Sequence, residues 1–207
     1  MAPQAQKGRS TPLPLQVLLQ RYRVDEDHAR AVADHALALF DRLTNLHGLP
    51  EARRRLLEVA ALLHNVGLTT DPDRHHTAGR DILLAHPPAE LDAHERRTVA
   101  LTTFLHRKRI TPEKLARLED RPLFTELPPP LQEEALILAA LVRIADGLDY
   151  SQSGSSEVGA AQWEGESIWI EVTGPYADID AARAEKKSDL WYLLFKTELR
   201  FETTSDW

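Results

Sequence analysis

The feature that most constrains the fold is the spacing of the apolar residues from about residue 13 to residue 150. These residues recur at intervals of three and four, with turn residues between the runs, a pattern typical of packed amphipathic helices. Three prolines at 128–130 interrupt the pattern, and Leu131 begins a new helix after them. We therefore predict a mainly α chain with a helical domain over residues 13–150, preceded by a flexible tail over residues 1–12.

The segment after residue 150 has a different pattern. Five of the six residues at 151–156 are serine or glycine, which predicts a short flexible hinge. Alternating residues around Trp163 and over 167–172 predict two strands joined at Gly165. Residues 178–195 return to helical spacing, and residues 198–204 alternate again. The sequence thus predicts a small β-β-α-β unit over 151–207, too small to be stable unless it docks on the helices.

Composition excludes several classes of function. The 32 acidic residues outnumber the 25 basic ones, for a formal charge of −7, which argues against a protein that binds extended nucleic acid by neutralising phosphates. The chain is 43% hydrophobic and 28% charged, as expected of a globular protein with a core and not of a disordered one. It has no cysteine, so a metal site would have to use His, Asp, Glu or Asn ligands.

No targeting or membrane segment is evident in the sequence. The first twelve residues are polar and lack the apolar stretch of a secretory signal, and no later stretch reaches about 18 uncharged apolar residues. We therefore predict a cytoplasmic protein without a membrane partner. The lack of cysteine fits an oxidising compartment equally well, so this localisation depends on the missing signal alone.

The first candidate site residue is His28. Asp25 is a good N-cap for a helix over about 25–46, and His28 lies beside the apolar face of that helix near its start. His35 follows seven residues later and projects in nearly the same direction, so it competes for any role assigned to His28. A hydrogen-bonded histidine at the edge of the core is the alternative for either residue.

The second candidate is the pair His64-Asn65. A helix over about 51–63 is charged at its start and apolar at its end, and it delivers this pair at its last turn. Gly67 then supplies the backbone freedom that lets the chain leave the helix and reach a cleft. An apolar helix that ends in two adjacent metal-capable side chains is more informative than a single histidine.

Two further groups follow. His75 and His76 stand at a predicted helix start, and His106 ends an apolar helix over 98–105 and precedes Arg107, Lys108 and Arg109. Taken alone, the histidine pair is equally well a solvated helix start, and the basic residues a solvated surface.

The last group lies on a helix over 136–149 that is apolar nearly all round and should be buried, yet carries Arg143 and Asp146 on one face. Buried charges need a partner. The alternatives are an ion pair between these two residues, or a metal-binding Asp146 with Arg143 facing a phosphate.

Taken in order, these residues resemble a known pattern. His28, His64-Asn65 and Asp146 are similar to the H…HD…D pattern of the HD superfamily of metal-dependent phosphohydrolases. More narrowly, the segments 27–32, 61–67, 75–79, 106–108 and 143–149 resemble the C-terminal region of the exopolyphosphatase and guanosine pentaphosphate phosphatase (Ppx/GppA) family. The resemblance covers about residues 13–204. The actin-like ATPase half that carries catalysis in that family would need some 300 further residues with glycine-rich phosphate loops, and we expect neither from these 207 residues.

The resemblance implies an HD-domain-like helical bundle, a bacterial source and one divalent cation, which would be Mn, Fe, Ni, Zn or Mg. The implied metal ligands are His28, His64, Asn65, Asp146, His76 and His106. His64 and Asp146 would be the catalytic residues, and Arg107, Lys108 and Arg143 would bind the substrate. Asn65 departs from the pattern, which has Asp at this position. Because a neutral amide usually serves one cation and binds it less tightly than a carboxylate, a single-metal site is expected.

Two functions follow from this sequence. The first is a metal-dependent phosphohydrolase in which the cation lowers the pKa of a bound water and polarises a phosphoryl oxygen. Its substrate would be a nucleotide or polyphosphate. The second is a non-catalytic module that binds polyphosphate or a nucleotide, or docks on a separate phosphatase chain; a homodimer is a further expectation. Asn65 favours the second function, and the retained histidines and Asp146 favour the first.

Overall fold

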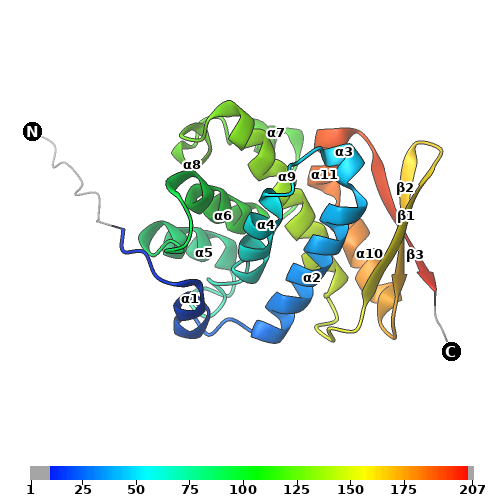
Figure 1. The fold of residues 1–207 in the computed structure, drawn as a ribbon, viewed down its shortest axis with the longest axis horizontal. Coiled ribbons are helices and arrows are strands. Elements are labelled where there is room, and N and C mark those ends of the chain that lie inside the picture. Colours follow the sequence, from blue (N-terminus) through cyan, green and yellow to red (C-terminus); the bar gives the residue numbers. More distant parts are fainter. Residues whose placement is uncertain (1–9, 205–207) are drawn as a thin grey trace, which may run out of the picture.

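The structure of the protein is a computed structural model, which describes residues 10–204. A run of helices comes first and a small three-stranded unit follows (Figure 1), which confirms the predicted fold class. The elements, in chain order, are α1 (Leu15–Arg21), α2 (Glu26–Arg42), α3 (Thr44–His47), α4 (Arg53–Leu62), α5 (His75–Ala85), α6 (Ala93–Leu105), α7 (Pro112–Ala116), α8 (Pro122–Thr125), α9 (Pro129–Leu148), β1 (Glu157–Glu164), β2 (Ser167–Thr173), α10 (Ala177–Lys187), α11 (Asp189–Phe195) and β3 (Glu198–Thr204).

Helix α9 is the centre of the molecule. Residues 135–145 of this helix are all buried, as the apolar composition on every side predicts. It contacts α2, α4 and α6 of the helical part and also α10 and α11 of the C-terminal unit (Figure 1). The hydrophobic core is one cluster that runs through both parts. The predicted boundary between two domains near residue 150 therefore separates parts that share one core. The division into domains stays a prediction.

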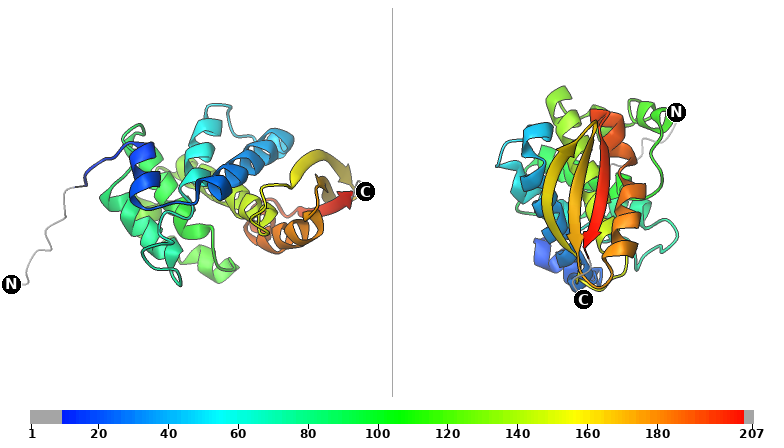
Figure 2. Two further views of the ribbon diagram at one scale, coloured as in Figure 1. Left: turned by 90° about the horizontal axis from the view of Figure 1, so that it is seen from below. Right: turned by 90° about the vertical axis from the view of Figure 1, so that its right-hand side faces the viewer.

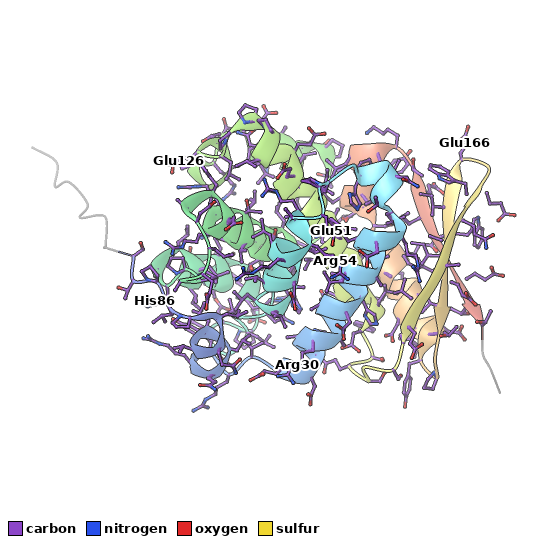
Figure 3. The ribbon with its side chains drawn as sticks, viewed as in Figure 1. Arg30, Glu51, Arg54, His86, Glu126 and Glu166 are labelled. Atoms are coloured by element: carbon purple, nitrogen blue, oxygen red, sulfur yellow. The ribbon has the colours of Figure 1, made fainter. Side chains whose placement is uncertain are left out.

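The C-terminal unit is a sheet with two helices behind it. Strand order is β1-β2-β3, with β1 antiparallel and β3 parallel to β2, so α10 and α11 form the crossover that a parallel pair requires. Figure 2 shows the sheet face-on with these helices behind it. Gly165 has a φ of 64° in the turn between β1 and β2, and the neighbouring Glu166 marks the tip of this hairpin in Figure 3.

Several boundaries differ from the sequence prediction. The helix expected over 178–195 is two helices that meet at Ser188, and the bend turns the Asp189 carboxylate toward Arg143. The serine segment after residue 150 is held to the fold, because Ser151 and Ser156 both donate hydrogen bonds to the buried carboxylate of Asp180. Residues 1–9 of the predicted tail lie outside the described residues. Thr11 donates its backbone N–H to Ala85 at 2.8 Å.

Close backbone packing joins α9 to α10 and the end of α4 to α5. A Cβ on Gly147 would lie 2.6 Å from the Cα of Ala184, so only glycine lets α9 and α10 approach this closely. Gly67 has a similar role, since a Cβ there would collide with the backbone of His75 and Gly79. The expected freedom of Gly67 is thus used for close contact with the start of α5, which fixes His75 near the end of α4.

Candidate metal centre and basic pocket

His28 is fixed at the start of α2 by contacts at both ends of its ring. The Asp25 side chain accepts the backbone N–H of His28 and caps the helix. The ring Nδ1 donates to Asp149 Oδ2 at 2.6 Å, and Nε2 lies 3.6 Å from Asp146 Oδ1. Burial lowers the pKa of His28, but the two nearby carboxylates of Asp146 and Asp149 outweigh burial and raise it. Because Nδ1 is bonded to Asp149, the ring is oriented with its Nε2 toward Asp146.

His64 is oriented in the same way by the backbone. It follows the end of α4, and its Nδ1 donates to the carbonyl oxygen of Ala61 at 2.6 Å. Its Nε2 is buried without a hydrogen-bond partner among residues 10–204 and lies 3.6 Å from Asp146 Oδ1. A buried polar atom without a partner is costly. This nitrogen is thus held ready for a ligand beside Asp146.

The residues predicted to converge, His28, His64 and Asp146, do lie together. Their three ligand atoms are all within 4.8 Å of one another. Ligands at about 2.0–2.2 Å from a common ion lie at most about 4.4 Å apart, so side-chain shifts of a few tenths of an ångström complete such a site. The three residues come from α2, the end of α4 and α9, and they form a group that could hold one metal ion.

Lys187 is a site residue that sequence reasoning missed. It is the last residue of α10, and its ammonium group contacts Asp146 Oδ2. Burial would raise the pKa of Asp146, but Lys187 and the two imidazoles outweigh it and hold this pKa well below its usual range. Burial lowers the pKa of Lys187, and the Asp146 carboxylate opposes that shift. In the sequence, Lys187 looks like an ordinary basic residue at a helix end, so no signal marked it.

The remaining histidines form a row beside the triad. His106 Nδ1 donates to Thr103 O at 2.6 Å, and the His75 Nε2 lies 3.1 Å from the His106 Nε2. The rings of His106 and His64 are 5.3 Å apart. The His76 ring stacks on Phe104 at 5.9 Å, so His75, and not the predicted His76, faces His106.

Burial lowers the pKa values of His75, His76 and His106, to about 4 for His76 and well below the ordinary value for His106. Their imidazoles are thus neutral near pH 7, the state in which histidine binds metals.

A basic pocket of about 820 Å³ adjoins the triad through Lys187. Its basic lining residues besides Arg143 are Lys108, Arg109, Arg183, Lys186, Lys187 and Arg200. Its acidic lining residues are Glu185, Asp189 and Glu198, and all three pair with arginines of the same pocket. An excess of positive charge therefore faces the cavity, although the whole chain is acidic.

The three residues predicted to bind substrate are placed differently from one another. Lys108 lines the pocket, whereas Arg107 donates to the carbonyl oxygens of Pro72 and Asp73 and supports the start of α5. Arg143 is 2% exposed, and its partner is Asp189, not Asp146. It also donates to Leu105 O at 2.5 Å, so each of its three guanidinium nitrogens already has a protein partner. Asn65 follows His64 and is half-buried.

Comparison with known families adds one finding. The family described as Ppx/GppA phosphatase, domain III, matches residues 14–199. That span contains the triad, Lys187 and all of the pocket lining except Arg200. A search of curated proteins found no significant match. Among the described residues, no helix is long and apolar enough to cross a membrane.

Proposed function

The chain belongs to the Ppx/GppA phosphatase domain III family, and from this membership and its site we propose that it is a divalent-metal-dependent phosphohydrolase acting on a nucleotide or polyphosphate. The observation that carries the proposal is the buried Nε2 of His64, which has no hydrogen-bond partner in the described part of the chain and points toward Asp146. His28 presents its Nε2 to the same carboxylate oxygen. Two nitrogen ligands and one oxygen ligand are a common donor set for a catalytic divalent ion.

In this proposal His28, His64 and Asp146 hold the cation, and Asp149 and the Ala61 carbonyl keep the two rings in position. A divalent cation supplies Lewis-acid activation of water and of a phosphoryl oxygen. The protein itself supplies charge for the substrate: Lys108, Arg109 and Lys187 line the pocket beside the triad, where they neutralise phosphate groups. Asn65, and His75 or His106, would be further ligands.

A second candidate function has an observation of its own. Lys187 already neutralises Asp146. Asn65 is uncharged, whereas the HD superfamily pattern has the carboxylate of an Asp at this position. Both features favour a non-catalytic module that binds polyphosphate or a nucleotide in the basic pocket. This module would bind phosphate compounds without releasing phosphate, so turnover distinguishes the two functions. Cytoplasmic localisation, a homodimer and a separate phosphatase chain as partner stay predictions.

The test is elemental analysis of the untagged chain purified without added metal, together with phosphate release from nucleotides and polyphosphate in Mn²⁺. We expect about one equivalent of a transition metal, and a loss of Mn²⁺ affinity in His64→Gln that exceeds the roughly 10–100-fold typical for loss of an outer partner. His35→Gln is the matched control, because His35 on α2 is buried like His64 but bonds Ser156 O at 2.7 Å. Phosphate release that is equal in His64→Gln and the unmodified chain contradicts the proposal.

A further inference from the structure

Lys187 belongs to two sites at once. Its ammonium group contacts Asp146 Oδ2 in the candidate metal centre, and its side chain also lines the basic pocket. The side chain is 15% exposed, so it is neither sealed in the core nor fully solvated. It therefore stands between the cavity and the triad.

Every carboxylate that lines the pocket is already paired with an arginine, so none is left for Lys187. Glu185 and Glu198 each accept a hydrogen bond from Arg200, and Asp189 accepts two from Arg143. The remaining charges that line the cavity are positive. An anion in this cavity would be a counter-ion for Lys187 that the protein does not provide there.

The metal centre gives Lys187 a competitor. Asp146 presents Oδ1 to His28 and His64 and Oδ2 to Lys187. A divalent cation held by His28, His64 and Asp146 Oδ1 would be separated from the Lys187 ammonium only by the Asp146 carboxylate. Two positive charges that close repel each other in a partly buried site. A lysine side chain has a flexible four-carbon stem, so its ammonium can move toward the pocket without a change in the backbone.

We propose that Lys187 couples the two sites, so that a divalent cation at His28, His64 and Asp146 and an anion in the basic pocket bind with positive cooperativity. With both sites empty, Lys187 neutralises Asp146. A cation repels the ammonium toward the pocket, and an anion attracts it there, so each ligand favours the state that binds the other. The coupling must be reciprocal, because it is a free energy shared by both binding equilibria. The inference rests on the proposed function for its cation site only.

The experiment is a Co²⁺ titration followed by visible absorbance, in sodium sulfate and in sodium chloride at matched ionic strength so that screening is equal. Sulfate is the probe because it carries the charge of a phosphate group and pairs weakly with Co²⁺. For the unmodified chain we expect sulfate to tighten Co²⁺ binding by about tenfold, within the usual range of such couplings. Without sulfate, Lys187→Met should bind Co²⁺ about tenfold more tightly than the unmodified chain, and sulfate should have no further effect.

Lys186→Met is the matched control, because Lys186 lines the same pocket from the adjacent position and is exposed. Lys186→Met should weaken sulfate binding. At saturating sulfate, Co²⁺ binding should still be tightened by the same factor as in the unmodified chain. Co²⁺ binding that is equal in both salts for the unmodified chain overturns the inference without any variant, and leaves the proposed function standing. No Co²⁺ binding by either the unmodified chain or Lys187→Met overturns the inference and the proposed function together.

Discussion

Two ion pairs join α9 to the C-terminal unit, and they are built differently. Arg143 donates through Nε and Nη2 to Asp189 Oδ1 and through Nη1 to Leu105 O. Asp189 Oδ2 accepts the backbone N–H of Ile110 at 2.7 Å. Three residues along the same helix, Asp146 meets a single lysine on one oxygen and two imidazoles at 3.6 Å on the other.

The difference shows which pair is structural. A guanidinium whose three nitrogens all donate to protein oxygens is fixed in one geometry, so Arg143 and Asp189 act as a clamp between α9 and α11. The Asp146 carboxylate is shared among groups that do not complete hydrogen bonds with Oδ1, and its lysine has a flexible stem. Neighbouring pairs across one junction can thus differ in role: one holds the two parts together, and the other leaves Asp146 Oδ1 facing the group proposed to bind a cation.

The largest expected effect tests the clamp. Asp189→Ala leaves Arg143 buried without its counter-ion, so it should lower the free energy of unfolding by about 3–5 kcal/mol. Lys187→Met should cost at most about 2 kcal/mol, because His28 remains beside Asp146. Urea denaturation measures both.

The double variant Arg143→Met with Asp189→Leu is the control, since it removes both charges at similar volume and should recover most of the stability. Equal losses for Asp189→Ala and Lys187→Met would break the distinction between the two pairs.

The second prediction concerns Asp149, the residue that orients His28 in the candidate metal centre. Asp149→Asn removes the carboxylate that accepts from His28 Nδ1, and we expect Mn²⁺ affinity to fall by about 10–100-fold. Isothermal titration measures this affinity. Asp180→Asn is a matched control, because Asp180 is an equally buried acid that bonds only serines of the 151–156 segment. A similar loss of affinity in both variants would mean that Asp149 acts through general stability.

The third prediction concerns Asn65, which follows His64, one of the residues grouped around Asp146. Asn65→Asp adds a charged ligand beside His64, so Mn²⁺ binding should tighten by about tenfold, or roughly 1.4 kcal/mol. Thermal melting with and without Mn²⁺ measures it, since a ligand that binds only the folded state raises the midpoint. Asn65→Ala should not increase the Mn²⁺ shift. An Asn65→Asp variant that melts at a lower temperature and gains no Mn²⁺ shift would favour the non-catalytic module.

The smallest predicted effect concerns His47, a buried histidine outside both ion pairs that makes the stability of the fold depend on pH. His47 donates through Nε2 to Phe40 O and accepts the Leu49 N–H on Nδ1, and burial lowers its pKa below the ordinary 6.5. Because the folded pKa is the lower one, the contribution of His47 is complete above pH 6.5 and is lost as the pH falls below that value.

His47→Gln can keep both hydrogen bonds without titrating. It should reduce the loss of unfolding free energy between pH 7 and 5.5 by up to about 1 kcal/mol. Urea midpoints at the two pH values measure the change. The same pH slope in both forms would assign the acid sensitivity to the other histidines.

Much of the fold and half of the site were predictable from local pattern. Helical spacing, the Asp25 cap and alternation over 167–172 depend on neighbours in the chain, and the structure has the helices, α2 cap and strand that they predict. The order His28, His64 and Asp146 also identified the three residues that converge. Each stands at the start or end of a helix or on a buried helix face, where its direction follows from helical periodicity.

The partners of those residues were decided by the tertiary structure. His75 and His76 are adjacent in sequence, and the rotation of α5 against Gly67 determines which of them faces His106. Asp189, Lys187 and Asp149 lie far from their partners in sequence, and the Gly147–Ala184 contact brings α10 close to α9. Periodicity gives the direction of a side chain relative to its own helix, whereas ion pairs depend on how separate helices are placed, which only packing of the whole chain determines.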